Sequence, residues 1–170
     1  PISKLVIAFI NDFNCSLNEK GCGGRTILHK ASLNGHVKLA EILISEFSLD
    51  PMSLADNKNT PLHYAALGGH HSVVSMLVSQ HNADLNARSN QNDLPLHLAA
   101  RRGHTKLVKA FINDFSCNPN EKGLEGRTIL HEASLDGHVE LAEILINKFG
   151  LDPMCVDDNE YTPQIGRAHV

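Results

Sequence analysis

The sequence predicts an all-α solenoid in which short helix-turn-helix units stack on one another and hairpin loops join them. The first observation is a period, because equivalent residues recur every 34 positions when the 170-residue chain is aligned with itself. Self-similarity with a period of roughly 20 to 50 residues is typical of solenoids, whose units cannot bury their apolar faces alone. The aligned columns are Thr26, Thr60, Leu94, Thr128 and Thr162, then a first histidine column of His29, His63, His97 and His131, then Gly35, Gly69, Gly103 and Gly137, and then a second histidine column of His36, His70, His104 and His138.

The second observation is the duplication of a block of three units. A shift of 102 residues matches residues 4–61 with residues 106–163 at 41 of 58 positions. The copies keep the apolar residues of the expected core, since packed interiors resist even small changes of volume. They exchange charged residues at positions that we expect to face solvent, where Lys30 becomes Glu132, Lys38 becomes Glu140, Glu46 becomes Lys148 and Lys58 becomes Glu160.

The first helix of each unit is predicted to be short. Thr60 offers a side-chain acceptor to the first free amides of a helix. Pro61 suits the first helical position, because its missing N–H has no partner there anyway. Gly69 can take the left-handed conformation that ends a helix. We therefore expect a helix of about two turns that begins near residue 61.

A second, amphipathic helix follows at once in each unit. Over residues 37–47 apolar side chains recur at i, i+3, i+4 and i+8, while polar side chains take another face. Segments rich in turn-forming residues, such as residues 55–59 and 89–93, then separate the helix pairs. We expect these segments to be exposed hairpin tips.

The unit resembles the ankyrin repeat. The hallmark of that family, Thr-Pro-Leu-His-x-Ala-Ala followed by Gly-His, stands here at residues 60–66 and 69–70. Tetratricopeptide repeats share the 34-residue length, but their pattern needs Trp, and this chain has none. The departures from the ankyrin pattern are mild, since Ile27 and Ile129 replace Pro and Leu94 replaces Thr. The resemblance implies an all-α ankyrin-repeat solenoid of helix-turn-helix units with hairpin loops.

The repeats also predict how the chain is divided. We expect it to be an internal fragment of a longer ankyrin-repeat protein. The repeat pattern stops after Pro163, and residues 165–170 match a translated sequencing adapter, so we expect residues 164–170 not to be native. The predicted divisions are a partial repeat with a second helix and loop at 1–25, full repeats at 26–59, 60–93, 94–127 and 128–161, and a truncated repeat start with the tail at 162–170.

Composition and charge exclude several classes of function. The net charge is −4, and no basic run is longer than Arg101–Arg102. Nucleic-acid binding depends on clustered Lys and Arg, so we expect no nucleic-acid partner. No apolar stretch reaches the roughly 18 residues that span a bilayer, so we expect no membrane span. The four cysteines form no CxxC motif and are too sparse for a disulfide framework, which favours an intracellular protein of the cytoplasm or nucleus.

The sequence contains no signature of catalysis, of a metal site or of another cofactor. His131–Glu132 begins like the zinc motif HExxH, but Leu135 stands where the second His is required. The column histidines come one per repeat, which is not a ligand cluster, and the resemblance implies that they form structural hydrogen bonds between neighbouring repeats. The glycine-rich residues 21–26 lack the Lys-Ser/Thr of a P-loop. We therefore expect no catalytic residue and no cofactor.

The resemblance implies a protein or peptide partner, which this family binds with its hairpin tips and the exposed side of its first helices along a concave groove. We expect Arg101 and Arg102 to anchor the partner, because Arg is enriched in binding hot spots. Asn86 resembles the hairpin asparagine that is hydroxylated in some ankyrin repeats. Carried over by position, the binding surface consists of Arg25, Leu33, Asn34, Asn57, Asn59, Leu67, Gln91, Asp93, Arg101, Arg102, Leu124, Glu125, Arg127, Leu135 and Asp136.

The same residues are compatible with two other functions. The repeats would then be the recognition or regulatory arm of a larger enzyme, ubiquitin ligase or ion channel, or else an elastic or spacing element. The fold does not choose among these functions, because function belongs to the sites that a fold carries.

Overall fold

The structure is a computed structural model that describes residue 17 and residues 19–164. The chain divides into two units, Pro1–Asp84 and Leu85–Val170. Most of the partial repeat predicted for residues 1–25 lies outside the described residues, as do residues 165–170 of the predicted tail.

The described part of the chain is all-α, which confirms the predicted fold class. Residues 17 and 19–164 hold eight α-helices and two 3-10 helices and contain no strand. Over this part of the chain every helix is too short or too polar to cross a membrane.

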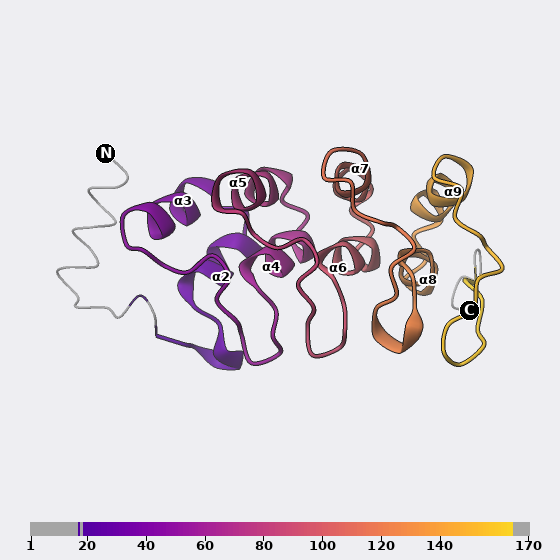
Figure 1. Ribbon diagram of the computed structural model, residues 1–170, viewed down its shortest axis with the longest axis horizontal. Helices are drawn as coiled ribbons and strands as arrows, with labels where there is room; N and C mark the ends of the chain where they lie inside the picture. Colours follow the sequence, from indigo (N-terminus) through magenta and orange to yellow (C-terminus); the bar gives the residue numbers. More distant parts are fainter. Residues whose placement is uncertain (1–16, 18, 165–170) are drawn as a thin grey trace. The chain divides into compact units, whose positions relative to one another are not determined.

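The first unit contains two consecutive helix pairs. The first helices of these pairs, α2 and α4, pack on each other, and each also packs on the second helix that follows it (Figure 1). The second helices, α3 and α5, are in contact as well. The elements of this unit are η1 (Cys22–Gly24), α2 (Ile27–Leu33), α3 (Val37–Ser45), α4 (Pro61–Leu67) and α5 (His71–His81).

The second unit repeats this arrangement. Helix α6 packs on α8, and each of the two packs on its own second helix, α7 or α9. The elements of this unit are α6 (Pro95–Arg101), α7 (Thr105–Asn113), η2 (Leu124–Gly126), α8 (Ile129–Leu135) and α9 (Val139–Asn147).

The predicted bounds of the first helices are confirmed. Helix α4 begins at Pro61, and the Thr60 hydroxyl oxygen accepts a hydrogen bond from the His63 amide at 3.4 Å. The helix ends after seven residues, and Gly69 follows with φ +75°. Residues with a side chain rarely adopt this left-handed backbone conformation. Glycine adopts it easily, so Gly69 can end the first helix and let the second helix of the pair begin.

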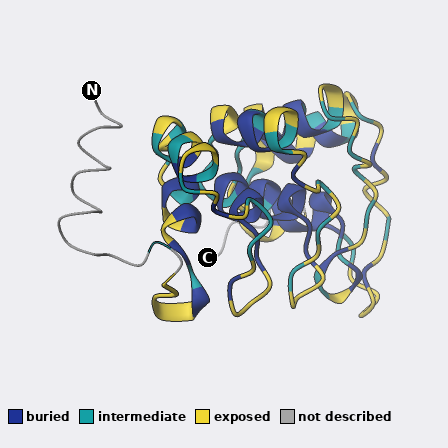
Figure 2. Cartoon of the chain, turned by 60° about the vertical axis from the view of Figure 1, so that its left-hand side comes forward, coloured by how far each residue is buried: buried dark blue, intermediate teal, exposed yellow. Residues whose placement is uncertain are grey.

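The second helices are amphipathic, as predicted. In α3 the polar side chains Lys38, Glu41 and Ser45 are exposed, while Ala40 and Leu43 are fully buried. Figure 2 shows the same division in colour, with buried residues concentrated on the first helices and on the inner sides of the second helices. The core therefore lies between the helices of neighbouring repeats within each unit.

Hairpins connect the helix pairs, and the middle residues of the predicted tips are exposed, whereas Ala55, Asn59 and Asp93 at their ends are buried. The Ala55 amide donates to the Asn59 carbonyl at 3.1 Å and closes a turn whose residues 56–58 are all exposed. In the second unit the Ser89 amide donates to the Asp93 carbonyl at 3.0 Å in the same way. The residues that close each turn are thus held by backbone hydrogen bonds, and the residues between them are presented to solvent.

The first histidine column ties each first helix to the loop behind it. His29, His97 and His131 are almost fully buried, and each accepts at Nδ1 from the backbone amide three residues earlier, at 3.1 to 3.2 Å. The proton therefore lies on Nε2, which donates to a carbonyl oxygen. These carbonyls belong to Ser53 at 3.1 Å, Glu121 at 3.0 Å and Tyr161 at 3.0 Å.

The second histidine column ties neighbouring repeats together. His70 Nε2 donates to the carbonyl of Leu33 at 2.9 Å, and His138 Nε2 donates to the carbonyl of Arg101 at 2.9 Å. Both carbonyls lie at the end of a first helix, where four backbone carbonyls lack intrahelical partners. The predicted structural role of these histidines is confirmed.

Candidate binding surface

The residues predicted to bind a partner are only partly accessible in the first unit. Asn34 and Asn57 are exposed, and the three residues Arg25, Leu33 and Leu67 are half-buried. Asn59 is buried at the base of its hairpin, so its inclusion in an exposed surface was wrong. Its position follows from the backbone hydrogen bond that closes the turn.

In the second unit most of the predicted residues are accessible. Gln91, Arg102, Glu125, Leu135 and Asp136 are exposed, while Arg101, Leu124 and Arg127 are half-buried. Asp93 is completely buried, so its inclusion in an exposed surface was also wrong. Asn86 is exposed in a turn of this unit, and its hydroxylation stays a prediction.

Asp93 is buried because it belongs to a charged cluster between α6 and α8, which we call the acid-pair cluster and define as Asp93, Arg101 and Glu132. The Arg101 guanidinium donates to Asp93 Oδ2 at 2.7 Å and to Glu132 Oε2 at 2.5 Å. Asp93 Oδ1 also accepts from the Leu124 amide at 3.0 Å. Glu132 Oε1 is buried and has no hydrogen-bond partner among the described residues. One guanidinium therefore holds two buried carboxylates.

The acid-pair cluster corrects two expectations from the sequence. Glu132 was expected to face solvent, like the other charged residues that differ between the two copies of the duplicated block. It is instead 2% exposed, because α6 covers this side of α8. Arg101 was expected to be a free surface anchor, but its donors are directed at two carboxylates within its own unit. Arg102 is exposed while Arg101 is half-buried, so Arg102 is the more accessible of the two arginines.

A second group of side chains surrounds a hollow beside α8, which we call the α8 hollow. Its volume is about 300 Å³, and Gln164 of the tail predicted not to be native forms part of its wall. The lining consists of Arg127, His131, Leu135, Asp157, Tyr161, Thr162, Pro163 and Gln164. Leu135 is 49% exposed and Tyr161 is 62% exposed, so two large apolar side chains are open to solvent here. The hollow combines this apolar surface with charged groups at its wall.

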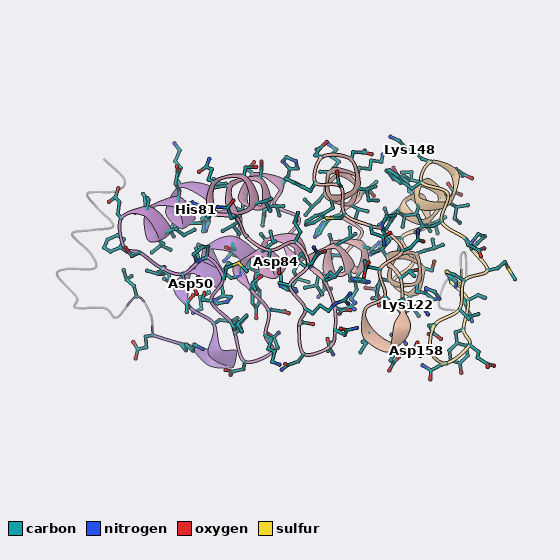
Figure 3. The ribbon with its side chains drawn as sticks, in the orientation of Figure 1. Asp50, His81, Asp84, Lys122, Lys148 and Asp158 are labelled. Carbon is teal, nitrogen blue, oxygen red and sulfur yellow. The ribbon has the colours of Figure 1, made fainter. Side chains whose placement is uncertain are left out.

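The charged groups of the α8 hollow are held in place by one another. Arg127 pairs with Glu125 at 2.6 Å and lies 3.6 Å from the buried carboxylate of Asp157. Burial raises the pKa of Asp157, but this effect is outweighed by hydrogen bonds from the backbone amides of Tyr161 and Asn159 and by the Arg127 guanidinium, so the pKa lies below its usual value. Two charged residues near these groups are labelled in Figure 3. Asp158 is the residue after Asp157 in the hairpin that follows α9, and Lys122 lies in the hairpin that precedes α8.

His97 lies against the acid-pair cluster and is neutral. Burial lowers the pKa of its imidazole below the usual 6.5, although the carboxylates of Asp93 and Glu132 and the Glu121 carbonyl act in the opposite direction. The nearby Arg101 guanidinium lowers the pKa further. The neutral ring is also what its hydrogen bonds require, because Nδ1 must accept while Nε2 donates.

The lowered pKa of His97 predicts that the fold loses stability in mild acid. Since the unfolded chain binds a proton near pH 6.5 and the folded imidazole resists it, this contribution to the free energy of unfolding is complete above about pH 6.5. It is lost as the pH falls from there toward the lowered folded-state pKa. Urea unfolding at a series of pH values should show this decline, and His97→Gln should reduce it. A ring proton resonance of His97 that titrates above pH 6.5 would contradict the prediction.

The thiols of Cys117 and Cys155 are not activated as nucleophiles. Burial raises the pKa of the Cys117 thiol to about 11 and also raises that of Cys155, so both thiols stay protonated near neutral pH. Within the described ranges, no three His, Cys, Asp or Glu side chains come together in a group that could hold a metal ion.

Sequence reasoning missed Glu132, Asp157 and Tyr161 as members of these clusters. A signal for the first was present, because Arg101 stands in a column that holds Leu33, Leu67 and Leu135 in the other repeats. A charge in an apolar column indicates a charged partner nearby. No comparable signal marks Asp157 or Tyr161, which depend on how the hairpin folds back on α8.

Comparison with known families agrees with this geometry. The family described as ankyrin repeats (3 copies) matches residues 2–89 and 83–157. The chain therefore belongs to the ankyrin-repeat family, whose members are generally protein–protein interaction modules. A search of curated proteins finds no match.

Proposed function

We propose that this protein is an interaction scaffold that binds a partner protein or peptide and carries out no catalysis. The observation that supports this most directly is the match of the ankyrin-repeat family to residues 2–89 and 83–157, because members of that family are generally protein–protein interaction modules. The α8 hollow, where Leu135 and Tyr161 are exposed beside the charged side chains of Arg127 and Asp157, is one candidate recognition site. An apolar floor with a few fixed polar groups is the usual character of a recognition site.

The α8 hollow suits a segment that presents one apolar side chain. Its volume of about 300 Å³ accommodates a single large side chain, and Leu135 and Tyr161 supply apolar surface for it. Arg127 pairs with Glu125 and lies 3.6 Å from Asp157, so its guanidinium is held in place beside the hollow. The exposed side chains of Arg102, Glu125 and Asp136 extend the candidate surface within the same unit.

The sequence supports two further parts of the proposal. The net charge of −4 and the lack of a basic cluster favour a protein partner over a nucleic acid. The free thiols of Cys22, Cys117 and Cys155 suit the reducing cytoplasm or nucleus, where we propose that the protein acts.

The proposal predicts that Leu135→Asp abolishes partner capture. A charge placed on the apolar floor of the hollow has to be desolvated when a partner binds, which costs about 2 kcal/mol or more. The measurement is affinity capture by the full chain, followed by the dissociation constant of each captured protein after purification. We expect Leu135→Asp to weaken the true partner at least about tenfold.

Val139→Asp is the matched control for this experiment. Val139 is 43% exposed at the start of α9, so the same chemical change is made on another helix of the same unit. Circular dichroism should show that both variants keep their helix content. If every purified partner binds Leu135→Asp and Val139→Asp equally well, the α8 hollow is not the recognition site.

A further inference from the structure

The turn between α2 and α3 contains the pair Asn34–Gly35, whose asparagine side chain is prone to lose ammonia. Asn34 is the only asparagine of the chain that a glycine follows. A glycine in this place offers an unhindered backbone nitrogen, because it has no Cβ. The duplicated block has Asp136 before Gly137, so at the equivalent position it already carries the carboxylate that loss of ammonia followed by hydrolysis produces.

The reaction takes place in two steps. The Gly35 nitrogen attacks Cγ of Asn34, so an N–Cγ bond forms and closes a cyclic imide. The Cγ–Nδ2 bond breaks, and the Gly35 amide proton leaves with the side-chain nitrogen as ammonia. Water then adds to one of the two imide carbonyls, whose bond to the nitrogen breaks, and a proton of the water returns to that nitrogen. Opening at Cγ gives aspartate, whereas opening at the backbone carbonyl gives isoaspartate, in which the main chain runs through Cβ and Cγ.

The folded turn holds the reacting atoms apart. Asn34 has ψ 4°, so the Gly35 nitrogen eclipses the backbone nitrogen of Asn34 and is turned away from its Cβ. The Gly35 amide donates to the Ser32 carbonyl at 3.3 Å. The leaving amide is held as well, since Asn34 Nδ2 donates to the Lys30 carbonyl at 2.9 Å. Ring closure therefore requires rotation about the Cα–C bond of Asn34, and this rotation breaks the hydrogen bond to Ser32.

His70 of the next repeat keeps this turn in place. Its Nε2 donates to the Leu33 carbonyl at 2.9 Å. A Cβ placed on Gly35 would meet His70 Nδ1 at 2.5 Å, so the ring lies directly against the glycine. Rotation within the turn therefore has to displace the His70 ring and break a hydrogen bond between two neighbouring repeats.

The exposure of Asn34 does not depend on where the sequence begins. The equivalent residue Arg102 belongs to a repeat that other repeats precede and follow in the sequence, and it is exposed as well. Solvent water, which the second step consumes, therefore reaches position 34 in the folded chain. The turn limits the first step, in which the ring closes.

We propose that Asn34 is a deamidation site whose reactivity is controlled by the contact between its turn and His70. The closed turn protects Asn34, and opening of the turn lets the Gly35 nitrogen reach Cγ. This modification is separate from the proposed scaffold function and does not depend on it. Either product adds a negative charge at an exposed position of the first unit.

The two products have different effects on the fold. Aspartate keeps the turn, because Asp136 has φ −90° and ψ 8° at the equivalent position, close to the φ −96° and ψ 4° of Asn34. Isoaspartate places an additional atom in the main chain between Leu33 and Gly35, so the turn no longer presents the Leu33 carbonyl to His70. An opening of the turn that ends in isoaspartate is therefore permanent.

The test measures the asparagine, aspartate and isoaspartate forms at position 34 by peptide mapping with mass spectrometry. The full chain is incubated at mildly alkaline pH, either folded in buffer or unfolded in guanidinium chloride. We expect the folded chain to react at least about tenfold more slowly, because the reaction has to await local opening of the turn. If Asn34 stays intact in the unfolded chain, or reacts equally fast in both states, the proposal is overturned.

His70→Ala tests the control by the neighbouring repeat, and His138→Ala is the matched control. His138 makes the same contact in the second unit, where its Nε2 donates to the Arg101 carbonyl at 2.9 Å and its ring lies against Gly103. We expect His70→Ala to raise the rate in the folded chain at least about threefold and His138→Ala to leave it unchanged. If both variants raise the rate equally, or if neither does, His70 does not control the site and the proposal is overturned. The comparison of folded and unfolded chains needs no variant, so it decides the proposal even if His70→Ala fails to fold.

Urea unfolding tests the difference between the products. Ion exchange separates the deamidated fraction, which contains both products, from the unmodified chain. The Asn34→Asp variant, which contains aspartate alone, should unfold at nearly the same urea concentration as the unmodified chain. The deamidated fraction should unfold at a lower concentration in proportion to its isoaspartate content. Equal midpoints for this fraction and for Asn34→Asp would overturn the effect assigned to isoaspartate.

Discussion

Replacing Arg101 with Ala is expected to lower the free energy of unfolding by about 3 kcal/mol. Asp93 is completely buried and Glu132 is 2% exposed, so both carboxylates stay away from water when the guanidinium is lost. Removing one member of a buried ion pair leaves a charge without compensation, and this cost exceeds what the intact pair contributes. The Arg101 side chain itself is 24% exposed, so water entering its place limits the loss.

Arg102→Ala is the control for this substitution. Arg102 is the next residue and is exposed, so its removal should change the free energy of unfolding by no more than about 0.5 kcal/mol. Urea unfolding followed by circular dichroism measures both variants under the same conditions. If the two substitutions cost the same, Arg101 does not hold the buried carboxylates in solution.

A triple variant separates the charge effect from a loss of packing. Other repeats of this chain have Asn59 at the Asp93 position, Leu67 at the Arg101 position and Leu98 at the Glu132 position. The combination Asp93→Asn, Arg101→Leu and Glu132→Leu therefore uses side chains that the same fold already accepts. Because buried ion pairs exchanged for apolar residues are often neutral in stability, we expect this variant to lie within about 1 kcal/mol of the unmodified chain.

The sequence predicted the helices well because their signals are local. Thr60, Pro61 and Gly69 lie within ten residues of one another and define a helix start and a helix end by backbone chemistry alone. The exposed face of α3 followed from the spacing of Lys38, Glu41 and Ser45 in the same way. The same local signals recur every 34 residues, so several repeats support each predicted helix boundary.

The binding surface was less predictable because burial there depends on residues that are distant in sequence. Glu132 is 31 residues from Arg101, and its burial depends on α6 lying across α8. Lys30 has the same local surroundings and is exposed. Equivalent residues of two copies of one helix thus differ in burial, and the sequence of the helix alone does not contain that information.

Gly103→Ala is expected to lower the free energy of unfolding by a similar amount, about 3 kcal/mol. Gly103 has φ +67°, where a side chain costs about 1 to 2 kcal/mol through backbone strain. A Cβ at this position would also meet His138 Nδ1 at 2.5 Å and two further ring atoms at 2.7 Å. The ring would have to move, although its Nε2 donates to the Arg101 carbonyl at 2.9 Å and ties the two repeats together.

Gly137→Ala provides the matched control, because the two glycines have similar φ angles but different neighbouring atoms. Gly137 has φ +75° in the equivalent turn of the next repeat, and a Cβ there would meet nothing within 4 Å. We therefore expect Gly137→Ala to cost only the backbone strain, about 1 to 2 kcal/mol, and the difference between the variants to measure the contact with His138. Thermal and urea unfolding of both variants gives this difference directly. Equal losses would show that the His138 ring moves aside freely, and the histidine column would then contribute little to holding neighbouring repeats together.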